Sequence, residues 1–351
     1  MQDTPIITTI IPTYQRPQML KRAINSVLRQ NLPHFKVCVY DNASGDETES
    51  LVCKMAKNDN RVHYYCHNEN IGAYKNFQYG LMQVDTPYFS FLSDDDFLLP
   101  DFFETAMRGF NRYPEAAFSA GSTITMTYQG KILYEPFSLW DKEGLISPPD
   151  GVLETIGDKY PIWTGIIFKS SVIKFTNGLD PEIGVCDLDF VSRIAAHYPF
   201  VVSKKASAIC INHSGSGSQI AKLSTYWPGW KKMIRNLTAN EELPTELRNK
   251  IEILLANQIK EIIFWIGIRS IEVSDYQQAS AASKILFEEL DSSKKSKQID
   301  CLLVLSRKSC LVWRLTVLLL AIRRKITGIT NMRRRKLQKK YDYLAKWLDT
   351  I

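Results

Sequence analysis

The first hundred residues alternate short apolar runs with segments of helical period. The runs at 6–11, 35–40, 62–66 and 88–92 are rich in β-branched and aromatic residues, which is typical of strands buried on both faces. Between them, apolar residues recur at helical spacing. Strand and helix alternate at intervals of about twenty-five residues, so this region is predicted to form βαβ units around a parallel sheet.

Local signals mark the ends of several predicted elements. Ser44 and Glu47 have the spacing of a capping box for the second helix. Pro100 followed by Asp101 is typical of a helix start, and a helix is expected over about 102–112.

Beyond that helix the periodicity loosens. Segments 117–127 and 132–134 flank Gly130 and predict a hairpin. A buried strand is expected at 165–168 and a helix at 185–196. From Trp227 onward the pattern is helical. We therefore expect an α/β domain over residues 1–220, with a mixed, mostly parallel sheet flanked by helices, and a helical extension over 221–351.

Composition supports a folded protein with two parts of different charge. The chain has 45% apolar residues, enough for a large core, and a net charge of +7. The basic excess lies in the last third, whereas the residues before about 230 are slightly acidic. The cysteines are scattered without zinc-ligand spacing, and the first apolar run is too short for a signal peptide. Reduced thiols and a cytoplasmic location are expected.

The C-terminal region combines apolar and basic segments. Residues 302–322 are the most apolar stretch, but three basic residues interrupt it, so it is a poor membrane-spanning helix. Basic clusters follow at 323–325 and 333–336. This composition favours a segment lying on an anionic membrane surface, and the alternative is a core helix with a solvated basic face. Nucleic-acid binding is disfavoured, because aromatic residues are not interleaved with the basic ones.

The candidate chemistry centres on three consecutive carboxylates after the strand at 88–92. Asp94, Asp95 and Asp96 repel one another, and water, hydrogen-bond donors or a cation must neutralise them. A divalent metal, Mn²⁺ or Mg²⁺, suits these oxygen ligands, while the alternative is a solvated acidic loop that caps the next helix. Tyr14 and Asp41 also follow strand ends, where ligands bind in parallel sheets.

Four motifs carry a resemblance to a known family. In chain order they are Ile10-Ile11-Pro12-Thr13-Tyr14-Gln15-Arg16-Pro17, Tyr40-Asp41-Asn42-Ala43-Ser44-Gly45-Asp46, Asn70-Ile71-Gly72 with Asn76, and Leu92-Ser93-Asp94-Asp95-Asp96. Their order and spacing resemble those of family 2 glycosyltransferases of the GT-A fold, including the acidic DXD motif. The resemblance covers about the first 220 residues.

The resemblance implies a nucleotide-diphosphate sugar donor and a divalent metal. The positions that match nucleotide-sugar contacts are Pro12, Tyr14, Arg16, Asp41, Lys75 and Asp94. The positions that match metal contacts are Asp95, Asp96 and His213. Ser93 stands where many relatives have Asp, so the register within the triplet stays open between Asp94 and Asp96.

The resemblance also implies a general base and an acceptor pocket. Asp187, followed by Arg193, matches the catalytic base, although Cys186 replaces the first acid of the family's usual pair. Asp189 is the alternative base or an acceptor contact, and Trp163 matches the segment that lines the acceptor site.

The expected function is inverting transfer of a sugar to a glycan acceptor, of the polyprenyl-diphosphate-linked type made for surface polysaccharides such as O-antigen. A water-soluble or protein acceptor remains open. A metal-dependent nucleotidyltransferase is the second hypothesis, and the lack of a Gly-rich basic loop after the first strand argues against it. A non-catalytic nucleotide-sugar-binding protein at the membrane is the third.

Overall fold

The computed structural model describes residues 4–135, 140–156, 159–213, 222–308, 328–348 and 350–351. The chain forms two compact units. One comprises Met1–Ser216 together with Lys340–Ile351, and the other comprises Gly217–Lys339.

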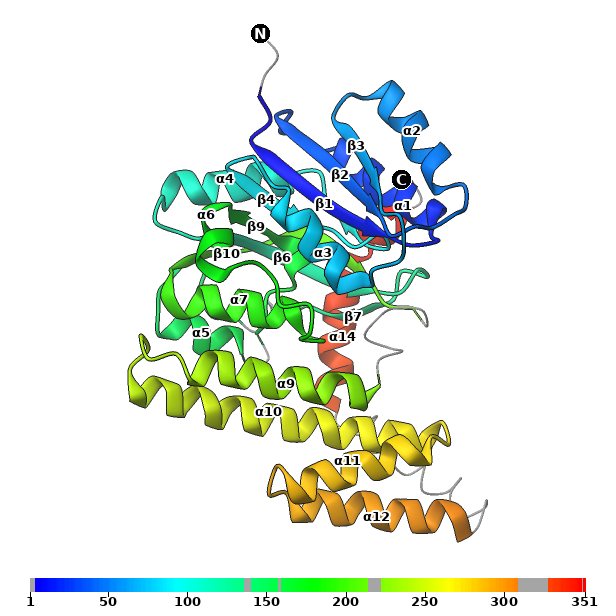
Figure 1. The fold of residues 1–351 in the computed structure, drawn as a ribbon, viewed down its shortest axis with the longest axis vertical. Helices are drawn as coiled ribbons and strands as arrows, with labels where there is room; N and C mark the ends of the chain where they lie inside the picture. The colour runs from blue at the N-terminus through cyan, green and yellow to red at the C-terminus, as the bar shows by residue number, and fades with distance from the viewer. Residues whose placement is uncertain (1–3, 136–139, 157–158, 214–221, 309–327, 349) are drawn as a thin grey trace. The chain divides into compact units, whose positions relative to one another are not determined.

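The first unit is built on a ten-stranded mixed sheet (Figure 1). Its strands are β1 (Ile7–Thr13), β2 (Phe35–Asp41), β3 (Val62–Cys66), β4 (Tyr88–Phe91), β5 (Phe97–Leu98), β6 (Phe118–Met126), β7 (Ile132–Tyr134), β8 (Gly144–Ile146), β9 (Ile166–Lys169) and β10 (Phe200–Ile211). The main order is β3-β2-β1-β4-β9-β6-β10-β5, with β7 on β6 and β8 on β10. Strands β3, β2, β1 and β4 are parallel, whereas β9 is antiparallel to both β4 and β6. The predicted mixed, mostly parallel sheet and the predicted hairpin are confirmed.

Short helices connect the strands. They are α1 (Pro17–Leu28), α2 (Thr48–Asn58), α3 (Ala73–Met82), α4 (Phe102–Arg112), α5 (Asp150–Thr155), the 3₁₀ turn η2 (Trp163–Gly165), α6 (Ser171–Thr176), α7 (Cys186–His197) and α15 (Tyr343–Leu348). Helix α1 begins with Pro17 at its first position, where the missing N–H costs nothing, and buries one apolar stripe from Leu20 to Val27.

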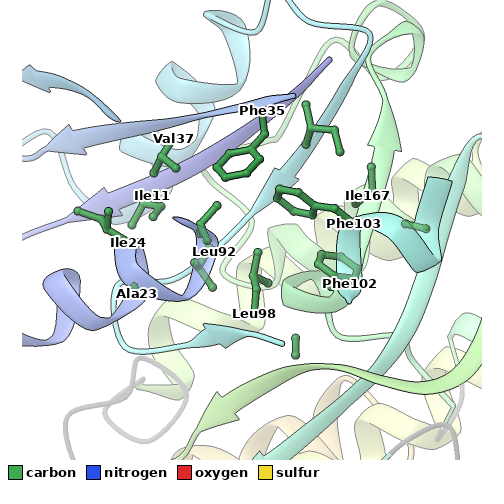
Figure 2. Packing of buried hydrophobic residues seen from close by; sticks show 14 of the residues in the cluster. Ile11, Ala23, Ile24, Phe35, Val37, Leu92, Leu98, Phe102, Phe103 and Ile167 are labelled. Atoms are coloured by element: carbon green, nitrogen blue, oxygen red, sulfur yellow. The ribbon is translucent and has the colours of Figure 1, made fainter. Parts of the chain in front are cut away.

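The two faces of the sheet have different cores. On one face, α1 and α4 pack aliphatic side chains and the rings of Phe102 and Phe103 against β1 and β2 (Figure 2). On the other face, Phe89 and Phe91 of β4 contact Phe168 of β9 and Phe190 of α7, with ring centroids 5.1–6.5 Å apart. Each fully buried ring contributes roughly 2–3 kcal/mol of hydrophobic free energy, so β4 is held firmly from both sides.

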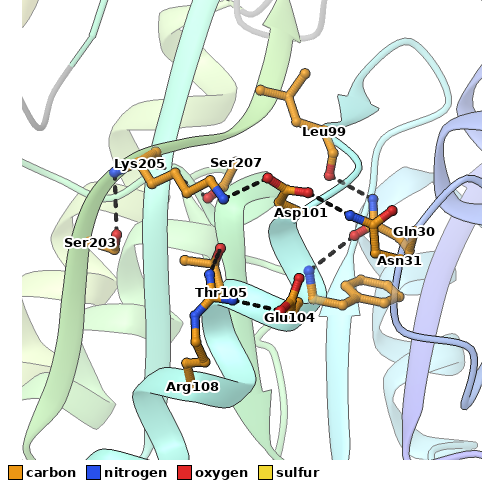
Figure 3. Close-up of polar contacts among 11 residues, drawn as sticks. Gln30, Asn31, Leu99, Asp101, Glu104, Thr105, Arg108, Ser203, Lys205 and Ser207 are labelled. Atoms are coloured by element: carbon orange, nitrogen blue, oxygen red, sulfur yellow. Dashed lines mark hydrogen bonds and ion pairs between the residues drawn. The ribbon is translucent and has the colours of Figure 1, made fainter.

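The chain that leaves the acidic triplet is fixed by the end of α1 (Figure 3). The buried Gln30 side chain donates to the Leu99 carbonyl at 2.7 Å and accepts from the Phe103 N–H at 3.0 Å. Asp101, the N-cap of α4, accepts from Asn31 at 2.5 Å and pairs with Lys205 of β10 at 2.6 Å. These bonds fix the backbone that follows the acidic triplet.

The second unit is helical in its described part. It contains α9 (Leu223–Thr238), α10 (Thr245–Glu272), α11 (Tyr276–Glu288), α12 (Ser293–Lys308) and most of α14 (Gly328–Tyr341). Helix α10 buries Ile251, Leu255, Ile259 and Ile263, as the amphipathic pattern predicts.

Among the described residues, every helix is too short or too polar to cross a bilayer. Most of the apolar stretch at 302–322 and the basic cluster at 323–325 lie outside the described residues.

The predicted capping box is wrong. Helix α2 begins after Glu47, and no side chain caps it there. Ser44 is instead bonded to Asp41 and to Gln15, because it lies between the two loops that follow β1 and β2.

Candidate active site

The loops after β1 and β2 are joined to each other. The Gln15 N–H donates to the Ser44 hydroxyl at 2.8 Å, and the Gln15 side chain donates to the Ser44 carbonyl at 3.1 Å. Gln15 and Ala43 both have left-handed backbone conformations, with φ of 53° and 60°. Residues other than Gly rarely adopt these angles. The backbone of both loops is therefore held in a strained, defined shape beside the strand ends.

Asp41 is buried at the end of β2 and fully engaged by the protein. One carboxylate oxygen accepts from the Ser44 N–H at 3.0 Å and from its hydroxyl at 2.5 Å. The other oxygen accepts from the Tyr64 hydroxyl at 2.7 Å. The predicted nucleotide contact is thus at the predicted strand end, but its carboxylate also organises the loop around it.

Asp94 and Asp95 share one cation. The Arg16 guanidinium lies 3.2 Å from an Asp94 oxygen and 3.3 Å from an Asp95 oxygen. Thr13, the last residue of β1, donates to the other Asp94 oxygen at 2.8 Å. Two carboxylates therefore face the β1 end, as the parallel topology predicts.

His213 lies against one of these two carboxylates, that of Asp95. Its Nε2 is 2.9 Å from Asp95 Oδ2, the oxygen that also faces Arg16. The ring of Tyr128, from the turn between β6 and β7, is 5.7 Å from the His213 ring. The structure thus brings together His213 and Asp95, which are 118 positions apart in the chain.

Asp96 faces the opposite way. One of its oxygens accepts from the Thr164 hydroxyl at 2.8 Å, and the other accepts from the Ile211 N–H at 2.9 Å. Its carboxylate therefore ties the acidic loop to η2 and to the end of β10.

Burial and mutual repulsion raise the pKa of the buried acids. Burial, followed by the charge of Asp95, raises the pKa of Asp94 to about 6, while Arg16 and Thr13 oppose the shift. The pKa of Asp96 is raised well above its ordinary value for the same two reasons. Such a cluster favours a ligand that brings positive charge.

The donor set fits a hard divalent cation bound together with a phosphate ligand. Among the described residues, no three His, Cys, Asp or Glu side chains converge on one point, so the protein offers a carboxylate and an imidazole rather than a closed cage. Mg²⁺ and similar ions commonly take one or two protein ligands and complete their shell with water and substrate phosphates. Asp95 and His213 match that arrangement, and the expected triad with Asp96 is not assembled.

Asp187 lies in the first turn of α7 and is partly exposed. Burial of its surroundings raises the pKa of its carboxyl, while the Leu188 N–H and the nearby Tyr160 hydroxyl oppose the shift. Cys186 beside it is buried, and the charge of Asp187 helps to raise the pKa of its thiol. A raised pKa makes the ionised carboxylate a stronger base, which suits it to accept a proton.

Asp189 has a structural partner instead. Its side chain is completely buried and accepts from Arg193 Nε at 2.8 Å. Arg193 also donates to the Thr176 and Gly178 carbonyls at 2.7 and 3.0 Å. The expected acceptor contact or alternative base at Asp189 is therefore not available in this structure, and Arg193 pairs with Asp189 rather than with Asp187.

The remaining predicted positions differ in exposure. Tyr14 is 41% exposed just beyond β1, and Lys75 is exposed in the first turn of α3. Pro12 is buried within β1. Trp163 is 9% exposed and stacks against Phe77 and Phe91, with both centroid distances 4.7 Å. The Trp163 ring therefore belongs mainly to the aromatic core.

Sequence reasoning missed three hydroxyl residues of the site. Thr13 and Thr164 donate to the acidic triplet, and Tyr160 faces Asp187. Thr13 lies in the first motif and Thr164 directly follows Trp163, so the sequence does point to the segments that contain them. Tyr160 has no such signal.

Comparison with known proteins gives a consistent result. Residues 8–158 match the family model of glycosyl transferase family 2. A GalNAc(5)-diNAcBac-PP-undecaprenol beta-1,3-glucosyltransferase of Campylobacter jejuni is 28% identical over 153 residues, which is 42% of this chain and 50% of that protein. An uncharacterized glycosyltransferase of Rickettsia bellii is 27% identical over 69% of this chain and 35% of its own length. The matched region thus spans half or less of these two relatives.

Solved structures share the fold at low identity. The crystal structure of S. aureus TarS 1-349 in complex with UDP-GlcNAc has a TM-score of 0.64 at 16% identity, covering 88% of this chain and 89% of that one. The mannosyltransferase PcManGT from Pyrobaculum calidifontis, in complex with GDP-Man and Mn²⁺, has a TM-score of 0.51 at 12% identity, covering 97% and 88%.

Proposed function

We propose that this chain is a family 2 glycosyltransferase that transfers a sugar from a nucleotide-diphosphate donor to a hydroxyl of a glycan acceptor, with inversion, because residues 8–158 match the model of that family and the fold is shared with TarS. The domain and its relatives support glycosyl transfer, and the geometry of this chain's own residues supports the assignment of roles.

One observation carries the assignment. A single segment lies beside both acidic clusters, since the Thr164 hydroxyl donates to Asp96 and the charge of Asp187 acts on the buried Tyr160 hydroxyl, which has no hydrogen-bond partner among the described residues. Cys210 of β10 also lies within electrostatic range of Asp96 and Asp187, whose charges both raise the pKa of its thiol. The candidate base and the acidic triplet are therefore close neighbours.

The chemical roles follow from the charges. The acceptor oxygen attacks the anomeric carbon as the bond to the diphosphate oxygen breaks, and Asp187 takes the hydroxyl proton. Arg16 lies where it can contact the negative charge that the departing nucleoside diphosphate acquires. A divalent metal held by Asp95 and His213 would supply Lewis-acid stabilisation of the same charge. Asp94 is assigned to the nucleotide sugar, and Asp96 to holding the loop.

The acceptor is proposed to be lipid-linked. The Campylobacter relative is named for an undecaprenol-linked acceptor, and the basic C-terminal composition suits an anionic membrane surface. The protein would then work at the inner face of the cell membrane as a peripheral protein.

A ligand screen tests the catalytic proposal. Thermal unfolding of the full chain is measured with a panel of nucleotide sugars and Mn²⁺, since a ligand that binds only the folded state raises its stability. The stabilising donor is then supplied with lipid-linked glycan acceptors, and the anomeric configuration of the product is read by NMR. No stabilisation by any nucleotide sugar, or retention of configuration, contradicts the proposal.

Flotation with anionic liposomes tests the membrane proposal. We expect the wild-type chain to float and a variant with Arg333, Arg334, Arg335 and Lys336 changed to Gln to remain in solution. A control variant with Lys284, Lys294 and Lys297 changed to Gln removes exposed positive charge elsewhere in the second unit. Equal flotation of the first variant and the control contradicts a specific role for the basic cluster.

A further inference from the structure

Residues Lys340–Ile351 belong to the first unit, although the whole second unit, Gly217–Lys339, precedes them in the chain. Tyr341, Leu344 and Leu348 are 2%, 0% and 4% exposed, so this C-terminal segment, Lys340–Ile351, is packed as core rather than as a free tail. Nothing in the motif pattern assigns it a role in the site.

The segment holds the hairpin of β6 and β7 at two points. Glu135, directly after β7, is 2% exposed, accepts from Ser122 of β6 at 2.8 Å and accepts from the Tyr341 hydroxyl. Gly130, in the hairpin turn, has no room for a side chain, because an added Cβ would lie 2.6 Å from the Ala345 Cβ. The turn and α15 are therefore in close contact.

That turn carries Tyr128, which faces the metal site. Its ring lies against His213, and the charges of Asp95, Asp96 and Asp94 act on its hydroxyl. The hydroxyl is buried and has no hydrogen-bond partner among the described residues. The position of the His213 ring thus depends on where the turn places Tyr128.

Arg22 of α1 connects these elements. Its Nη2 donates to the Leu348 carbonyl of α15 at 3.4 Å. Its guanidinium carbon lies 5.0 Å from the Phe97 ring centroid and 5.7 Å from that of Tyr128, within cation–π range. Phe97 directly follows Asp96, so Arg22 contacts both the chain that leaves the acidic triplet and Tyr128, whose ring lies against His213.

We propose that Arg22 is a positioning residue of the metal site, and that the C-terminal segment holds Arg22 and the β6–β7 turn in place. The proposal rests on the proposed function for the identity of Asp95 and His213 as metal ligands. Partners behind a ligand commonly tune metal affinity by about 10–100-fold, even though they do not touch the ion.

Two arginines of α1 provide a matched test. Arg29, at the C-cap of α1, donates to the Thr350 carbonyl at 2.6 Å and to its hydroxyl at 3.3 Å. Arg22→Met and Arg29→Met each remove one arginine that contacts the segment, but only Arg22 also contacts Tyr128 and Phe97. Tyr341→Phe removes the hydroxyl bonded to Glu135 without changing the size of the ring.

The first measurement is the binding of Mn²⁺ alone. The EPR signal of free Mn²⁺ reports how much of the ion remains unbound. We expect about tenfold weaker binding in Arg22→Met, weaker binding in Tyr341→Phe, and wild-type affinity in Arg29→Met. Equal affinity of Arg22→Met and Arg29→Met overturns the proposal. A general loss of folding in Arg22→Met is recognised from its thermal unfolding midpoint, and Arg22→Lys, which keeps the charge near the rings, should then recover part of the affinity.

The second measurement does not depend on a metal. Amide hydrogen exchange without Mn²⁺ should accelerate in residues 127–131 for Arg22→Met and Tyr341→Phe, but not for Arg29→Met. If the wild-type chain binds no Mn²⁺ while this exchange pattern holds, the metal assignment fails and the positioning role stands. If exchange in the turn is the same in all variants, the positioning role fails.

Discussion

The two acidic clusters of the site, Asp94–Asp96 after β4 and Asp187 with Asp189 in α7, follow one principle. In each cluster one carboxylate is assigned a role in catalysis. A neighbouring carboxylate in the same cluster makes hydrogen bonds or an ion pair that hold two parts of the fold together. Asp95 faces Arg16 and His213, whereas Asp96 is bonded to Thr164 and Ile211.

In α7 the same division occurs two residues apart. Asp187 is partly exposed, whereas Asp189 is completely buried against Arg193. Whether a carboxylate is available to a ligand therefore depends on the partner that it faces and not on its position in a motif. Substitutions at the four positions should therefore separate into losses of catalysis and losses of stability.

The largest effect is expected for Asp187→Asn. Without a carboxylate to accept the acceptor proton, kcat should fall by about four orders of magnitude. Donor affinity should stay close to that of the wild-type chain in titration calorimetry, because the role proposed for Asp187 is toward the acceptor hydroxyl. A parallel loss of donor affinity would remove Asp187 from the role of base.

Asp95→Ala and Asp96→Ala provide the second comparison, on one loop. Asp95→Ala should lower kcat/KM by about two to three orders of magnitude and abolish its dependence on Mn²⁺ concentration. Asp96→Ala should instead lower stability by about 3 kcal/mol, because the Ile211 N–H and the Thr164 hydroxyl lose their acceptor. If the Asp96→Ala variant has the unfolding midpoint of the wild-type chain but its activity no longer depends on Mn²⁺, the structural role assigned to Asp96 is contradicted.

Asp189→Asn is expected to affect folding more than turnover. It removes the charge that faces the Arg193 guanidinium, 18% exposed, and leaves only a neutral amide oxygen and two backbone carbonyls as its acceptors, at a cost of about 3 kcal/mol in stability. The thermal unfolding midpoint should fall, while kcat of the folded fraction stays within a fewfold of the wild-type value. A kcat loss as large as that of Asp187→Asn would assign Asp189 to the chemistry.

The smallest effect is a change in the pH dependence of stability. Burial raises the folded-state pKa of Asp187 above that in the unfolded chain, so protonated Asp187 stabilises the fold at low pH. This contribution is fully present below the unfolded pKa and is lost as the pH rises through the folded pKa. Asp187→Asn should therefore raise the unfolding midpoint at pH 7.

That gain should shrink as the pH falls through the folded pKa of Asp187 and vanish below the ordinary pKa of aspartate. A midpoint difference that is the same at every pH would show that ionisation of Asp187 carries no cost. The neighbouring groups that act on this carboxyl are Tyr160, Cys186, Asp189 and Cys210.

The sequence predicts the parallel half of the first unit well, for a physical reason. Strands β1, β2 and β4 are buried on both faces and followed by helices of clear period, so their ends and the residues beyond them can be located from the pattern alone. Asp41, Asp94 and Asp95 all lie where that pattern puts them.

Contacts between distant segments could not be predicted in the same way. The acids of the triplet are identical in the sequence, and only the bonds from η2 and β10 distinguish Asp96 from Asp95. Tyr160 has no motif around it, and Ser44 fits a capping box that its bonds to Asp41 and Gln15 exclude. The C-terminal segment has two Lys and two Asp, and it carries no motif that would indicate its burial.

The return of Lys340–Ile351 to the first unit has a consequence for biogenesis. The ribosome completes every strand of the sheet before it makes the second unit, and the residues that contact Arg22 and Glu135 follow only afterwards. At ordinary translation speeds this delay is on the order of ten seconds. During that interval the nascent chain would have its sheet but an unsupported β6–β7 turn, so Tyr128 would reach its place beside His213 only after residues 340–351 have been made.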